Sequence, residues 1–256
     1  SNELSVNSTL GFEADMKVII IQMQGAQINT SNDGSFGNIT DLGQTGKYET
    51  AEIQSITATG IVLNKLLVNA YDYYGKVQVV SVPVYESILV NDELTAVAWN
   101  GTTGGVLALE VTGQMTTDAN IDVSGKGFRG GTSSVANNNC TWLTNANNYS
   151  YDQSDWRGAQ KGEGIAIANA GQEHGRGAQA NGGGGGNDHN SGGGGGSNIS
   201  SGGQGGDNNE PSFFGCDGTF PGIGGKALTA SSDRIFMGGG GGAGHENNGV
   251  GTDGGN

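Results

Sequence analysis

The chain has 256 residues, with 25 acidic and 11 basic side chains, 51 glycines and only 3 prolines. A formal net charge of −14 argues against partners such as nucleic acid or anionic membrane, because both are themselves negatively charged. No apolar run approaches the ~18 residues of a membrane-spanning helix, so membrane insertion is not expected.

Glycine and charge are distributed unevenly along the chain. Residues 1–124 hold 12 of the 51 glycines and have a net charge of −10, whereas residues 125–256 hold the other 39 glycines. We therefore predict an N-terminal all-β region over 1–112 and a glycine-rich β region over 113–256. The chain begins without Met and ends inside the glycine pattern, which we interpret as a fragment or a processed segment.

The sequence pattern of the first region predicts β-strands. Its segments are rich in Val, Ile and Thr, several alternate apolar and polar positions, and Gly/Asn/Asp-rich turns separate them. Nothing shows a sustained helical period. We expect a β-sandwich or barrel-like arrangement with strands at 17–23, 51–58, 60–68, 76–85 and 105–113.

After residue 113 the pattern changes. Short β-like pieces at 114–116 and 120–124 are closely spaced, as in a β-solenoid whose coils stack on one another. Two polar insertions follow, over 132–160 and 207–228, and both contain aromatic residues. Each insertion also holds one of the two cysteines, Cys140 and Cys216, in a spacing that fits no zinc motif. We predict a disulfide between them, the alternative being two free thiols.

Runs of five glycines occur at 182–186, 192–196 and 238–242. A flexible linker is the simplest interpretation of such a glycine-rich composition. The equal run lengths and the strand-like segments around them favour order instead. Glycine chains in an extended helix of three residues per turn can pack side by side and hydrogen-bond to each other. We therefore expect an ordered polyglycine bundle of the polyglycine II type.

Several blocks, taken in order, resemble a known kind of module. They include "MKVIIIQMQGA" (16–26), "TAVAWNGTTGGVLALEVTG" (95–113), "IDVSGKGFRGG" (121–131), "GRGAQANGGGGGN" (175–187) and "DRIFMGGGGGAGH" (233–245). Together they resemble the glycine-rich module of very large secreted Bacteroidetes surface proteins, of the gliding-motility adhesin or type 9 secretion substrate type. The resemblance covers nearly the whole chain.

This resemblance implies an extracellular or outer-surface location and a non-enzymatic structural or adhesive role, in cell adhesion or in a filament. It implies partners among other domains of the same large protein or further copies of this chain, and no catalytic residues. The alternative is a carbohydrate-binding or accessory module of a polysaccharide-degrading protein. Its ligands would be surface glycans, stacked on Trp142, Tyr151 and Trp156.

Catalytic and metal sites have weak support in the sequence. His189 and His245 adjoin glycine runs and could act beside acidic neighbours, but we favour a structural role for them. The pair Asp152 and Asp155 could serve a glycosidase, although any acidic chain offers such pairs. We expect no cofactor. A calcium ion is the alternative, bound by oxygen ligands in the glycine-rich turns that contain Asp33, Asp207 and Asp253.

Overall fold

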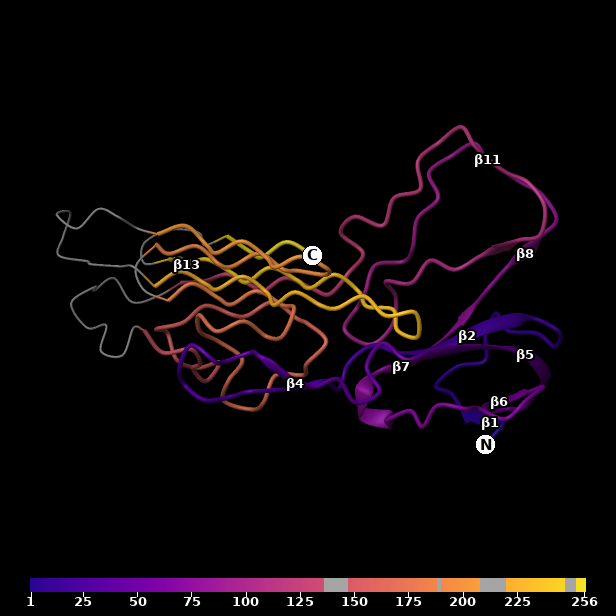
Figure 1. The fold of residues 1–256 in the computed structure, drawn as a ribbon, viewed down its shortest axis with the longest axis horizontal. Coiled ribbons are helices and arrows are strands. Elements are labelled where there is room, and N and C mark those ends of the chain that lie inside the picture. Colours follow the sequence, from indigo (N-terminus) through magenta and orange to yellow (C-terminus); the bar gives the residue numbers. More distant parts are fainter. Residues whose placement is uncertain (136–146, 188–189, 208–219, 247–251) are drawn as a thin grey trace.

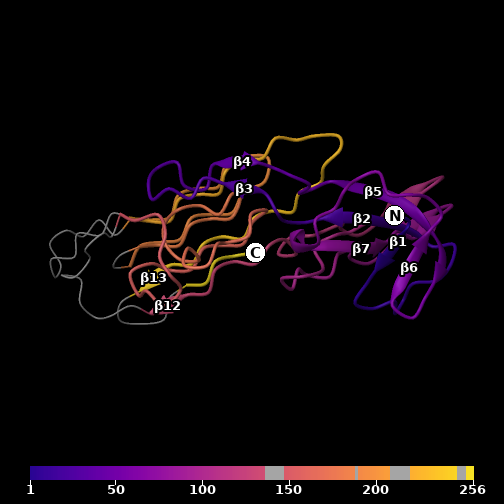
Figure 2. The same ribbon diagram turned by 90° about the horizontal axis from the view of Figure 1, so that it is seen from below.

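The computed structural model describes residues 1–135, 147–187, 190–207, 220–246 and 252–256. Within these ranges the regular elements are β-strands and one 3-10 turn, η1 (Tyr73–Gly75), which confirms the all-β class. The largest sheet lies at one end of the molecule (Figure 1). The glycine-rich segments run side by side along the long axis toward the other end, and the second view agrees (Figure 2).

A five-stranded antiparallel sheet is the centre of the N-terminal region. Its order is β1-β6-β5-β2-β7, so β1 and β7 are edges and the sheet is open rather than barrel-like. The strands are β1 (Glu3–Ser5), β6 (Gly60–Leu63), β5 (Tyr48–Ile56), β2 (Lys17–Gln22) and β7 (Val77–Ser81).

The alternation of β2 explains why the sheet has two apolar faces. Val18 and Ile20 are buried in a core that also contains Ile53 and Leu63 of neighbouring strands. Ile21 points the other way, into a second core built with residues of the glycine-rich half. Because side chains alternate along a strand, a fully apolar run such as 18–21 is buried only when both faces are covered.

Short strand pairs make up the rest of the regular structure. One pair is antiparallel, β3 (Gln27–Ile28) with β4 (Ile39–Asp41). The other pairs are parallel: β8 (Val84–Tyr85) with β10 (Glu110–Val111), β9 (Ile88–Val90) with β11 (Met115–Thr117), and β12 (Ser134–Val135) with β13 (His245–Glu246). A bridge between Leu94 and Ile121 continues the parallel pairing. Residues 82–99 and 109–126 therefore form one parallel two-stranded ribbon, which projects from the body in Figure 1.

The expected strands exist, but three are much shorter than predicted. The strand expected over 76–85 divides at Pro83, which lacks a backbone donor, and its two parts pair with different partners. The strand expected over 60–68 ends at Leu63, and the chain then leaves the sheet with exposed side chains. In the segment 105–113 only Glu110–Val111 is paired as a strand. The predicted boundary at residue 112 falls inside the ribbon.

One contact region joins the sheet to the glycine-rich half. Arg234 donates to the backbone oxygens of Gly43 and Thr45, and the Ile235 amide donates to Gly46 O at 2.9 Å. Lys47 forms an ion pair with Asp233 at the same place. The segment 231–237 is thus held against the turn before β5, which fixes where the following glycine run begins.

Replacing Ile20 by alanine is expected to lower the free energy of unfolding by about 2–5 kcal/mol, because a cavity would remain in the centre of the sheet. Ile20 is 1% exposed. Leu89→Ala is the control, since Leu89 is an exposed ribbon side chain and a surface change costs within about 0.5 kcal/mol. Urea unfolding of both variants measures this, and equal losses would contradict the core assignment.

Candidate functional site

The glycine-rich segments are connected by a regular pattern of backbone hydrogen bonds. We use the name glycine array for residues 182–186, 192–196, 202–206, 222–225 and 238–244. Along 239–245, the amide of every third residue donates to the same neighbouring segment. These bonds run from Gly239 N to Ser197 O, from Gly242 N to Gly194 O and from His245 N to Ser191 O.

The amides between those positions donate in other directions. Gly240 and Ala243 donate to Glu163 and Gln160 of a second neighbour, while Gly241 and Gly244 donate to residues 255 and 252 of a third. One extended segment therefore bonds to three others around its axis. A β-strand, whose ladder bonds leave in only two directions, cannot do this.

The distances between segments leave no space for side chains at most array positions. A Cβ at Gly184 would lie 1.9 Å from Arg176 O, and one at Gly240 would lie 2.0 Å from Arg129 O. At Gly194 the corresponding distance, to Ile223 O, is 2.3 Å. Gly203 is different, because nothing lies within 4 Å of its Cβ position. Most of the array glycines are thus required by backbone packing.

Asn181 precedes the first glycine run and is fully buried. Its side chain accepts from the Ile165 amide at 2.8 Å and donates to Ser197 O and Met237 O at 3.2 and 3.1 Å. One amide group therefore links three segments where the run begins. A buried, fully bonded side chain of this kind fixes the register of the segments that it joins.

A buried lysine lies beside the array. Lys161 is 4% exposed, its Nζ donates to Tyr149 O at 2.5 Å and to Gly175 O at 3.1 Å, and it lies 4.6 Å from the centre of the Phe36 ring. Burial lowers the pKa of Lys161 well below its ordinary value, and the charge of Glu173 opposes this shift in part. Nothing in the local sequence marks Lys161, because distant segments bury it.

The carboxylates considered for catalysis lie near His174. The Asp155 carboxylate binds the Arg157 guanidinium, and the Asp152 carboxylate accepts from Ser154; these hydrogen bonds lower the pKa of both acids. The Nδ1 of His174 lies 2.9 Å from Gly158 O, and burial lowers the pKa of its ring. Both carboxylates are therefore ionised at neutral pH, so neither is held as a general acid.

The three aromatic residues predicted to stack on sugars do not form one described platform. Tyr151 is 5% exposed, and the Arg157 guanidinium lies 4.9 Å from the centre of its ring. Trp156 is half-buried, and its backbone oxygen is 2.8 Å from Nε2 of His245. Trp142 lies outside the described residues, as do Cys140, Cys216 and His189, so the predicted disulfide stays a prediction.

Two of the three aspartates predicted to bind calcium accept backbone hydrogen bonds instead. The Asp33 carboxylate accepts from the Ser35 amide at 2.8 Å, and the Asp253 carboxylate accepts from the Ser133 amide at 2.7 Å. Asp207 is exposed. Across the described ranges, no group of three or more His, Cys, Asp or Glu side chains is placed to hold a metal ion. The structure therefore does not bring Asp33, Asp207 and Asp253 together as a site.

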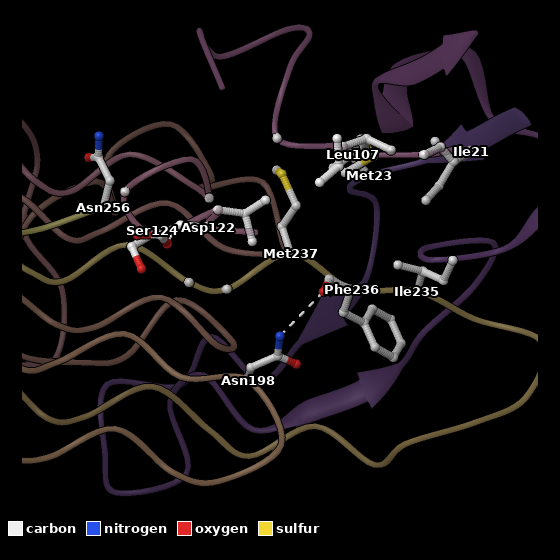
Figure 3. A pocket seen from close by; sticks show the side chains of 18 of the residues that line it. Ile21, Met23, Leu107, Asp122, Ser124, Asn198, Ile235, Phe236, Met237 and Asn256 are labelled. Carbon is white, nitrogen blue, oxygen red and sulfur yellow. Dashed lines mark hydrogen bonds between the residues drawn. The ribbon is translucent and has the colours of Figure 1, made fainter. Parts of the chain in front are cut away.

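A groove of about 760 Å³ lies where the sheet, the ribbon and the segment 235–239 meet (Figure 3). Ile19, Ile21 and Met23 line it from β2 and the residues after β2, and residues 105–108 and 121–125 line it from the ribbon side. Its volume lies within the range of ~300–1,000 Å³ typical of ligand pockets. No local sequence pattern predicts this groove, because it is formed between segments rather than within one.

Comparison of the chain with protein-family models, curated proteins and solved structures gave no match. The described part of the chain contains no helix with the length and apolar character required to cross a bilayer.

Lys161→Met is expected to flatten the pH dependence of stability over the range that lies below pH 10.5 and above the lowered pKa of folded Lys161. In this range an unfolded lysine, with a pKa near 10.5, binds a proton that the buried folded lysine does not bind. The free energy of unfolding of the wild type therefore rises with pH through this window. Urea titrations at several pH values measure the slope.

The exposed Lys65 provides the control for the loss of a lysine side chain, because Lys65→Met should change the free energy of unfolding by no more than about 0.5 kcal/mol. Identical slopes for the wild type and Lys161→Met would show that Lys161 is not the source of the effect.

Proposed function

We propose that the chain is a non-enzymatic structural or adhesive module of a larger extracellular surface protein or filament, built around an ordered polyglycine II-type bundle. The observation that carries the proposal is the hydrogen bonding of the glycine array. Amides at positions i and i+3 donate to the same neighbour, as a helix with three residues per turn requires.

The close approach of the segments supports the same proposal. Cβ positions within about 2 Å of neighbouring carbonyls mean that the array excludes side chains over most of its length. A flexible tether would impose no such requirement on its glycines. The parallel register of β8 with β10 and of β9 with β11 supports a short solenoid-like part in the ribbon.

The location and partners in this proposal come from the resemblance to secreted Bacteroidetes surface modules. The acidic composition agrees with them, since a chain of net charge −14 stays apart from nucleic acid and anionic membrane. The packed state of Tyr151 favours the structural role over the carbohydrate-binding alternative, because a buried ring has no free face for a sugar.

Placing alanine at Gly184 tests the bundle. The new Cβ would meet Arg176 O at 1.9 Å, and the resulting overpacking should cost about 1–3 kcal/mol of stability. Gly203→Ala is the matched control in the same array. It has open space at the Cβ position, so it should be neutral within about 0.5 kcal/mol or slightly stabilising.

Urea unfolding gives the two free energies, and amide hydrogen exchange gives a second readout. The amides of 182–186 should be protected in the wild type, since each donates to a backbone oxygen. Neutral Gly184→Ala together with fast exchange over 182–186 would mean that these glycines are only a tether.

The proposal also expects no catalysis. Purified protein should not turn over polysaccharides, esters or peptides, with Asp152→Asn as the variant for comparison. Turnover that the wild type shows reproducibly and that Asp152→Asn abolishes would replace the structural role with an enzymatic one.

A further inference from the structure

Two adjacent tyrosines lie on the surface at the turn η1, which is the coiled ribbon in Figure 1. Tyr73 and Tyr74 are 86% and 77% exposed, and their ring centres are 5.5 Å apart with the ring planes at 78°. Rings that meet at a corner in solvent bury little area within the fold. Their apolar faces are therefore available to a ligand.

The backbone of this turn is held firmly. The Asp72 carboxylate accepts from the Tyr74 amide at 3.0 Å, and the Asp72 amide donates to the side chain of buried Gln22 at 2.7 Å. Gly75 packs so closely that a Cβ there would lie 2.2 Å from Gln22 Nε2. An aromatic side chain on a fixed backbone loses little conformational entropy when it binds, which is why tyrosine is common in binding surfaces.

A pocket of about 220 Å³ lies beside Tyr74. Residues from 25–30 and 167–169 line it together with the turn. These walls are fixed to each other near their starts, because the Gly25 amide donates to Ile165 O at 2.9 Å. The volume is below the ~300–1,000 Å³ of pockets that enclose a whole drug-sized ligand, so the pocket suits one ring of a ligand that continues over the surface.

The pocket presents unused polar atoms. Asp72 Oδ2 and the side-chain oxygens of Gln27, Thr30 and Asn169 accept no hydrogen bond from any described residue. Among the described residues that line the pocket, none is lysine, arginine or histidine. Amide, hydroxyl and carboxylate groups bind hydroxyls, whereas an anionic ligand would meet an uncompensated carboxylate here.

Apolar surface lies at the same place. Ile167 lines the pocket and is partly exposed, next to the ring of Tyr74. A sugar ring has C–H groups on its faces and hydroxyls around its edge, so it matches an aromatic face bordered by polar oxygens. A quaternary ammonium would use the rings and Asp72 but would leave the uncharged polar side chains unpaired.

We propose that this pocket binds one ring of a neutral glycan chain, stacked on Tyr74 and hydrogen-bonded through its hydroxyls to Asp72 and Gln27. Asn169 binds a further hydroxyl, and the next sugar of the chain lies against Tyr73. The inference rests on the adhesive side of the proposed function and names its ligand class.

Affinity electrophoresis through gels that each contain one polysaccharide tests the site. Mannan, galactan, xylan and a β-glucan are the neutral probes, and alginate is the acidic one. At least one neutral polysaccharide should retard the wild type, and alginate should not. Tyr74→Ala should weaken the apparent affinity at least about tenfold, and Gln27→Ala should weaken it as well.

Two variants serve as controls. Tyr74→Phe keeps the stacking ring and should be retarded as the wild type is. Tyr85→Ala removes an exposed tyrosine of the ribbon, outside the pocket, and should also leave retardation unchanged.

Three results would overturn the inference: no retardation by any of the neutral polysaccharides, retardation by alginate alone, or equal retardation of the wild type and Tyr74→Ala. If no neutral polysaccharide retards the chain and calorimetry shows choline binding that Tyr74→Ala abolishes, the pocket belongs to a cationic ligand instead.

Hydrogen exchange over 182–186 separates this inference from the proposed function. Protected glycine amides in a chain that no polysaccharide retards would reject the sugar site alone. Unprotected glycine amides would reject the bundle, whatever the electrophoresis shows. Cleavage of a retarding polysaccharide by the wild type would reject the non-enzymatic role and keep the site.

Discussion

The structure depends on where the backbone amides of the glycine-rich half find acceptors. These residues have almost no side chains to bury, so the apolar term that stabilises most folds is small here. Ordering each residue costs about 1–2 kcal/mol in conformational entropy. Backbone hydrogen bonds in three directions, together with close contact between chains, are what remain to offset that cost. This explains why array glycines such as Gly184 and Gly242 leave no room for a Cβ.

An array of this kind needs its ends fixed, because its glycines alone do not specify a register. Asn181 supplies part of this by joining three segments at the start of the first run. The contacts of Arg234 with Gly43 and Thr45 supply another part by holding the start of the last run against the sheet. The turn before β5 thus fixes the position at which the last glycine run begins.

The sequence predicted the elements that depend on local patterns and missed those that depend on distant contacts. The apolar run 18–21 and its turn-bounded neighbours identified the strands of the sheet, and Pro83 explains where one of them was drawn too long. Repeated glycines with strand-like flanks led us to expect an ordered bundle in the second half, which stays a proposal. The burial of Lys161 and of Tyr151 was not predictable, because segments far apart in the chain cover them. The groove was missed for the same reason.

Three cations of this acidic chain connect distant segments. Lys17 reaches Glu110 in the ribbon, Lys47 reaches Asp233 before the last glycine run, and Arg129 binds Glu163 across the array. Exposed pairs of this kind contribute little to stability, about 0–1 kcal/mol each. Because each pair joins two specific segments, it favours one packing arrangement of these segments over the alternatives.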